Sequence, residues 1–99
     1  MADRPSPLSA EDVSQRLSRL TGWSGGTDGI ERTVAAESFP AAIELVRKVA
    51  EVAEEMNHHP DIDIRWRNVR FALSTHDAGG VTALDLEQAE RINRLAAAV

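Results

Sequence analysis

All three histidines of this 99-residue chain stand in two short polar segments. His58 and His59 follow one another in Asn-His-His-Pro, and His76 occurs in Ser-Thr-His-Asp. An imidazole donates or accepts a proton near neutral pH, so three of them in one place would form an acid–base site. His59 and His76 are separated by 17 positions, and the structure of the intervening segment decides whether they meet.

The intervening segment has the alternating pattern of a β-hairpin. A two-residue turn at Arg67-Asn68 gives it one wholly apolar face, which a half-buried strand pair requires and which includes Trp66 as a core residue. In this register Asp61 lies opposite Ser74, and two steps further His59 lies opposite His76. Directly opposed residues have Cβ atoms about 4.5–5.5 Å apart. The apolar face would be formed by the pairs Trp66 with Val69, Ile64 with Phe71, and Ile62 with Leu73.

Two carboxylates are spaced to orient these imidazoles. Glu54 precedes His58 by four residues, so one further helical turn would place both side chains on the same face. Asp85 follows His76 by nine residues and lies at the start of the last predicted helix. We expect Glu54 to hold His58, and Asp85 to hydrogen-bond His76 and set its tautomer.

Composition excludes several classes of protein. The length predicts one domain with a single core, and the absence of cysteine excludes disulfides and thiolate metal ligands. The net charge is −5 and no block of basic residues occurs, which argues against nucleic-acid binding. No long apolar run and no signal peptide are evident. We therefore expect a soluble cytoplasmic protein that binds neither nucleic acid nor membrane.

Capping residues and apolar periodicity predict the helices. Ser9 and Ser38 are expected to cap the first two helices, and Thr82 with Asp85 forms a capping box for the third. The helices should extend from about 10 to 20, from about 39 to 57 and from about 83 onward. The apolar face of the middle helix is expected to contain Phe39, Ala42, Ile43, Val46, Val49, Ala50, Ala53 and Met56.

The predicted element order is α-β-β-α-β-β-α. A short strand starts at Trp23, an alternating strand covers 30–36, and the hairpin supplies two more. The fold class is α+β, a four-stranded antiparallel sheet with the helices packed on one face. Residues 1–7 are expected to be a flexible tail, and residues 8–99 a single domain.

The spacing of these residues resembles the signature of the pterin-4a-carbinolamine dehydratases. Glu54, His58-His59-Pro60, Trp66, His76 and Asp85 occur at the family's spacing. The flanking residues are similar from about Trp23 to Ile92. Val34 and Ala36 depart from the pattern, since relatives tend to carry aromatic residues there, and this puts the oligomer contacts in doubt more than the site.

The resemblance implies an enzyme that dehydrates a 4a-hydroxytetrahydropterin to quinonoid dihydropterin and water, in tetrahydrobiopterin recycling. It implies no metal and no redox cofactor. His58, His59 and His76 correspond to the catalytic histidines. The family's substrate-binding positions correspond to Trp23, Glu54, Pro60, Asp61, Ser74, Thr75 and Asp85. The resemblance and the free edges of a small sheet also predict a homodimer or homotetramer.

Other interpretations of the same residues remain open. His58-His59 before a proline is also typical of a polar helix exit, and three histidines with an aspartate could bind zinc, although adjacent residues in an extended segment point to opposite sides. Some members of the family bind a transcription factor's dimerisation helix, so a protein-interaction module is the alternative function. A role toward another pterin, as in molybdopterin metabolism, would use the same ring recognition.

Overall fold

The computed structural model describes residues 5–99, and its elements follow the predicted order. The elements are α1 (Ala10–Leu17), β1 (Ser24–Gly26), β2 (Gly29–Ala35), α2 (Phe39–Met56), β3 (Asp61–Arg65), β4 (Asn68–Leu73), η1 (His76–Ala78) and α3 (Ala83–Ala96). The four strands form one antiparallel sheet in the order β1-β2-β4-β3. The element η1 is a short 3-10 helix between β4 and α3.

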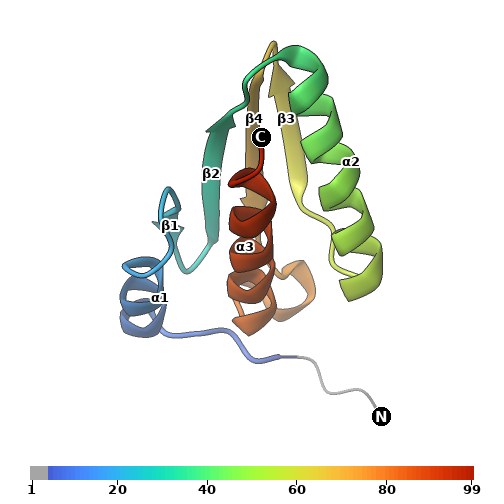
Figure 1. Ribbon diagram of the computed structural model, residues 1–99. Helices are drawn as coiled ribbons and strands as arrows, with labels where there is room; N and C mark the ends of the chain where they lie inside the picture. Colours follow the sequence, from blue (N-terminus) through green and yellow to red (C-terminus); the bar gives the residue numbers. More distant parts are fainter. Residues whose placement is uncertain (1–4) are drawn as a thin grey trace.

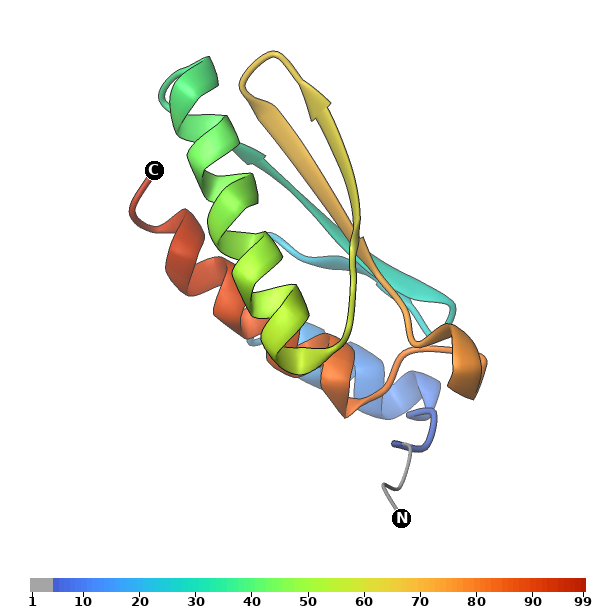
Figure 2. The ribbon, with the colours of Figure 1, turned by 90° about the vertical axis from the view of Figure 1, so that its right-hand side faces the viewer.

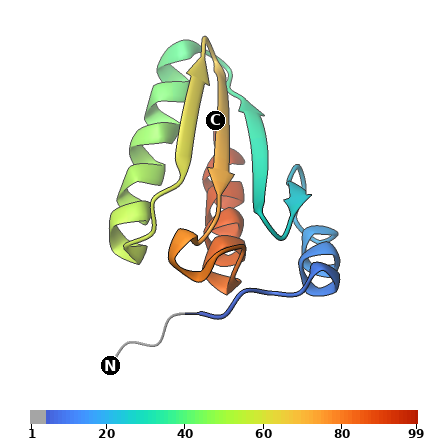
Figure 3. The same cartoon turned by 180° about the vertical axis from the view of Figure 1, so that it is seen from behind.

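The sheet has one covered and one open face. Helices α2 and α3 lie side by side on the same face, and the short α1 lies at the end of the sheet near β1 (Figures 1 and 2). The opposite face carries no helix, as the view from behind shows (Figure 3). The predicted α+β architecture is therefore confirmed. Within residues 5–99, no helix combines the length and the apolar character needed to span a membrane.

Helix α2 has a capping residue at each end, and the C-terminal one sets the direction in which the chain enters the first two histidines. The Ser38 hydroxyl accepts from the N–H of Ala41, and Asn57 ends the helix in the left-handed conformation, with φ of 50°. The N–H of His58 then donates to the carbonyl of Ala53, and that of Asn57 to the carbonyl of Glu54, which is a Schellman motif. His58 therefore leaves the helical path instead of extending it by another turn.

The hairpin forms, but its predicted register is wrong by two residues. Arg65 pairs with Asn68, Ile64 with Val69 and Ile62 with Phe71, so the two-residue turn is Trp66-Arg67. A slip of two residues preserves the alternation of faces, and the apolar pattern therefore cannot distinguish the two registers. Asp61 lies opposite Ala72 where the ladder ends, and the predicted opposition of His59 and His76 is lost.

Trp66 is a turn residue and not a core residue, which corrects the prediction. Its φ is 56°, the left-handed conformation that two-residue hairpin turns require at their first central position. At the tip of the hairpin the indole is 67% exposed. The Arg67 guanidinium lies 4.5 Å from the centre of the ring, a cation–π contact that partly compensates for this exposure.

The core lies between the sheet and the helices. Helix α2 buries Ala42, Leu45, Val49 and Ala53, which follow one another at helical spacing. Phe39 and Ile43 of the predicted apolar face are exposed, and Leu45, which the prediction omitted, is fully buried. The buried stripe is thus rotated from the predicted one, because only the side of α2 that faces the sheet is covered.

Val34 and Ala36, the positions that depart from the family's aromatic pattern, are buried core residues. Smaller side chains there change core packing and not a surface available to a partner.

Helix α1 is shorter than predicted. It ends at Leu17, and the chain continues through turns in which Leu20 still packs against the core. Leu8 is anchored at its start, because its N–H donates to the carbonyl of Val81. The flexible tail predicted for residues 1–7 falls mostly outside the described residues. That tail and the domain boundary at residue 8 stay predictions.

Candidate active site

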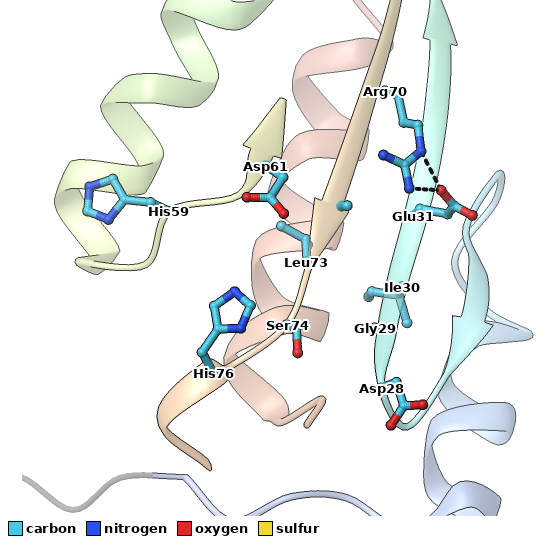
Figure 4. Close-up of a pocket in the computed structure, with 11 residues that line it drawn as sticks. Asp28, Gly29, Ile30, Glu31, His59, Asp61, Arg70, Leu73, Ser74 and His76 are labelled. Carbon is cyan, nitrogen blue, oxygen red and sulfur yellow. Dashed lines mark hydrogen bonds and ion pairs between the residues drawn. The ribbon is translucent and has the colours of Figure 1, made fainter. Parts of the chain in front are cut away.

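The three histidines gather where α2, β4 and α3 meet at one end of the sheet. A cavity of about 240 Å³ is lined by all three, together with Asn57, Ser74, Thr75 and Asp77. A second cavity of about 340 Å³ shares His59, Ser74 and His76 with it and extends over the open face of the sheet. Figure 4 shows His59, Asp61 and His76 on one side of this second hollow, and Asp28, Glu31 and Arg70 on the other. Together the cavities have the size of a small-molecule site.

His58 is held by a buried carboxylate. Its Nε2 lies 2.6 Å from Oδ1 of Asp85, and its side chain is 11% exposed. Asp85 belongs to the first turn of α3 and is fully buried. Because the carboxylate accepts, the imidazole donates from Nε2 and Nδ1 becomes its acceptor when the ring is neutral. The dyad therefore fixes both the orientation and the tautomer of His58.

Two threonines and the backbone complete the hydrogen bonds of Asp85. Oδ2 accepts from the Thr75 hydroxyl at 2.8 Å and from the N–H of Thr82 at 2.9 Å. Thr75 has only one proton to give, so the Thr82 hydroxyl donates to it across 2.7 Å. The capping box predicted from Thr82 and Asp85 is confirmed. The same carboxylate thus starts a helix and orients an imidazole.

His59 forms a separate, exposed pair with Glu54. Its Nε2 lies 2.6 Å from a carboxylate oxygen of Glu54, and the two side chains are 56% and 80% exposed. Such a pair is weaker than the buried one, because water competes for both partners. Glu54 belongs to the last turn of α2, so the end of this helix positions His59 at the mouth of the cavity.

The predicted pairing of carboxylates and imidazoles is therefore wrong. Each of these residues except His76 does form a carboxylate–imidazole pair, but with another partner than the predicted one. Glu54 holds His59 and not His58, because the left-handed Asn57 turns His58 away from the helix face. Asp85 holds His58 and not His76, because the start of α3 lies beside the end of α2. His76 begins η1, is exposed, and has no side-chain partner among residues 5–99.

The other predicted substrate-binding residues divide into two groups. Asp61, Ser74 and Thr75 line the cavities. Pro60 and Trp23 line neither of them. Trp23 is buried beside α1 and donates from its indole nitrogen to the side chain of Asn93 at 2.7 Å. Trp23 belongs to the hydrophobic core, and its role in substrate binding stays a prediction.

Several residues of the site were not anticipated from the sequence. Asp28 and Glu31 reach the larger cavity from the β1–β2 turn and β2, and Arg70 reaches it from β4, where it pairs with Glu31. The pairing of β2 with β4 brings these residues together across 39 positions of sequence. No local pattern signals such a contact, since it depends on which strands become neighbours.

The arrangement is suited to moving protons on a small bound molecule. It offers imidazoles from two directions around a cavity open to solvent, one fixed by a buried carboxylate and one without a side-chain partner among residues 5–99. Among residues 5–99, no group of three or more histidine, aspartate and glutamate side chains is arranged to hold a metal ion.

The family model for pterin 4 alpha carbinolamine dehydratase matches residues 6–95. The chain belongs to this family. A relative from Nocardia farcinica, named "Putative pterin-4-alpha-carbinolamine dehydratase", is 57% identical over 89 residues, which cover 90% of this chain and 94% of the relative. The resemblance predicted from the histidine spacing is thus confirmed.

Solved structures give the same result for the fold. A transcriptional coactivator/pterin dehydratase from Brucella melitensis superposes with a TM-score of 0.87 at 30% identity, covering 92% of this chain and 99% of that one. A pterin dehydratase-like protein described as a RuBisCO assembly factor in the alpha-carboxysome has a TM-score of 0.62 at 21% identity, covering 75% and 86%. At that identity, the second likeness concerns the fold alone.

Proposed function

We propose that the protein dehydrates a 4a-hydroxytetrahydropterin to quinonoid dihydropterin and water, as a step of tetrahydrobiopterin recycling. The observation that carries the proposal is the three histidines around one cavity, with His58 fixed by Asp85. Membership of the carbinolamine dehydratase family supports the substrate class.

The reaction needs two proton transfers. The bond from C4a to its hydroxyl oxygen breaks as a general acid protonates that oxygen, and water leaves. A general base takes the proton of N5, and the electron pair of the N5–H bond forms the C4a–N5 double bond. Histidine suits both transfers near neutral pH. We propose that His58 and His76 carry them and that His59 holds the pterin ring, with Asp61, Ser74 and Thr75 lining its site.

A stopped-flow measurement of carbinolamine decay tests the proposal. The observed first-order rate constant should rise linearly with the concentration of purified protein, after subtraction of the uncatalysed decay. Bovine serum albumin at matched concentration controls for nonspecific proton transfer by protein side chains. Decay that is no faster with folded protein than with this control would refute the proposed activity.

We predict that His59→Ala raises KM more than it lowers kcat. The ring is half exposed and tethered to Glu54 by a surface pair, so it is poorly fixed for proton transfer but well placed to contact a ligand. An increase in KM of about three- to tenfold corresponds to one lost hydrogen bond of about 1 kcal/mol. Glu54→Gln, which weakens the tether and keeps the ring, should give a smaller effect in the same steady-state assay. A drop in kcat without change in KM would contradict the assignment.

We also propose that two copies associate through β3. This strand is a free edge of the sheet, and the side chains of Ile62 and Ile64 on it are 36% and 37% exposed, with exposed Phe39 and Ile43 on α2. An antiparallel pairing centred on Asp63 would set each Asp61 opposite an Arg65 of the second copy. Opposite charges facing one another across strands stabilise such a pair.

The oligomer prediction is tested by light scattering at micromolar concentration. The wild-type protein should have at least the mass of a dimer. Ile64→Lys should shift it toward the monomer, because an edge-strand lysine opposes strand pairing. Ser14→Lys, at an exposed position of α1, is the matched charge control and should keep the wild-type mass. A monomeric wild-type protein would rule out the association.

A protein-interaction role is the second candidate function. It is favoured by one observation, the structural neighbour described as a transcriptional coactivator as well as a pterin dehydratase. The two functions are separable, because His58→Ala and His76→Ala should lower kcat for dehydration and leave any partner binding unchanged.

A further inference from the structure

Gln88 is a buried polar residue that the proposed chemistry does not use. It is fully buried on α3, one turn after Asp85. Its Nε2 donates to the backbone carbonyl of His58 at 2.6 Å. Its Oε1 is buried and has no hydrogen-bond partner within the described part of the chain. A buried amide oxygen without a partner lowers stability, and an apolar side chain of similar size would avoid that cost.

Helix α3 therefore contacts His58 twice. Asp85 and Gln88 are three residues apart and project from the same face of the helix. Asp85 holds the imidazole, at Nε2, and Gln88 holds the main chain, at the carbonyl. The carbonyl needs such a contact, because His58 follows the left-handed Asn57 and lies outside the helix.

We propose that Gln88 is a positioning residue for His58. The Ala53 carbonyl already holds the N–H of His58, but nothing else in this set of contacts fixes the φ and ψ angles of His58. With the ring as the only other contact, the backbone could turn about those bonds and the imidazole would then pivot on its carboxylate. A second hydrogen bond at the carbonyl removes that freedom. The catalytic consequence rests on the proposed dehydratase function, whereas the geometric one does not.

The first test replaces Gln88 by methionine, which is unbranched and of similar length but donates no hydrogen bond. We expect kcat to fall about 10- to 100-fold, the scale on which small misplacements of a catalytic group act, with KM nearly unchanged. The control is Glu87→Met, an exposed neighbour on the same helix, which should keep the wild-type kcat. Rates are normalised to folded protein from circular dichroism, so that any loss of folding is removed. An unchanged kcat per folded Gln88→Met protein would overturn the proposal.

The second test reads the position of the ring without activity. The proton on Nε2 of His58 should give a downfield NMR signal, assigned by its absence in His58→Ala. It should broaden or disappear in Gln88→Met and persist in Glu87→Met. A persistent, unshifted signal in Gln88→Met would overturn the proposal even if activity had changed. A wild-type protein without dehydratase activity would refute the proposed function and leave this spectroscopic test intact.

The third test is rescue by Gln88→Glu, which keeps the shape of the side chain. A protonated carboxyl donates to the His58 carbonyl, whereas a carboxylate repels it. We expect kcat, relative to wild type at each pH, to recover toward acidic pH in Gln88→Glu and not in Gln88→Met. The His58–Asp85 pair and the Glu55–Arg91 pair are the same in both proteins, so the comparison at each pH removes their contribution. Equal relative rates for the two variants at every pH would overturn the proposal.

Discussion

Replacing Asp85 by asparagine should lower kcat about 100-fold or more, which is within the range of one positioned acid or base. The carboxamide can still accept from Thr75 and Thr82 through its oxygen. Its NH2 group then faces Nε2 of His58, where the carboxylate accepted a hydrogen bond. The imidazole must present a lone pair there, and the proton moves to Nδ1, so the ring enters the site in the wrong tautomer. Single-turnover kinetics of carbinolamine decay measures the loss.

Asp85→Ala should add a large loss of stability to this loss of activity. It removes the Asp85 half of the capping box of α3 and leaves Thr75, the N–H of Thr82 and the ring of His58 with unpaired polar groups in a buried place. Together these effects should lower the free energy of unfolding by about 3 kcal/mol. Urea denaturation should show a lower midpoint at unchanged slope. Asp85→Asn should lose less, and equal stability of the two variants would show that the carboxyl hydrogen bonds are not what holds this end of α3.

The carboxylate and the imidazole should behave as one unit. His58→Ala is expected to lower kcat at least about tenfold, and it also leaves Oδ1 of Asp85 buried and unpaired, so about 1–3 kcal/mol of stability should be lost. If Asp85 acts only through His58, then adding Asp85→Asn to His58→Ala should lower kcat no further. Additive losses of kcat would show that Asp85 acts on the substrate independently.

His76→Ala should give the second large effect, a fall in kcat of about 10- to 10⁴-fold with almost no loss of stability. The ring is exposed, lines both cavities, and has no side-chain partner among residues 5–99 to lose. Polar side chains at such positions contribute little to packing. The same kinetic assay, together with thermal denaturation, separates the two quantities. The uncatalysed decay of the carbinolamine sets the lower limit of the measurable rate and must be subtracted.

A conservative variant provides the control for His76. His76→Gln keeps a polar side chain that can hydrogen-bond but cannot transfer a proton near neutral pH, so it should be as inactive as His76→Ala. If His76→Gln retains most of the activity, the residue binds the substrate and does not transfer a proton. If His76→Ala lowers the melting temperature and leaves the activity of the folded fraction unchanged, then His76 has a structural role.

Local patterns in the sequence were enough to locate the elements. Ser38 and Thr82 start their helices where capping predicts, and the alternation of β3 and β4 predicts a hairpin with the faces it has. The length of α1 and the buried face of α2 were predicted less accurately from the sequence. Helix length near a turn and burial on a partly covered helix depend on which neighbours are present, and a periodic pattern does not specify them.

The sequence was enough to single out the three histidines and two acidic residues of the candidate site, because residue types at characteristic spacings form a recognisable pattern. Their partners were decided by the tertiary structure. The left-handed Asn57 separates His58 from Glu54, and the packing of α3 beside α2 places Asp85 within hydrogen-bond distance of His58. The hairpin register depends on whether Trp66 enters the turn, which an alternating pattern cannot specify. Hydrogen bonds across 27 or 30 positions, such as those of Asp85 and Gln88 to His58, require the assembled fold, since no local sequence rule relates residues that meet only after the helices pack.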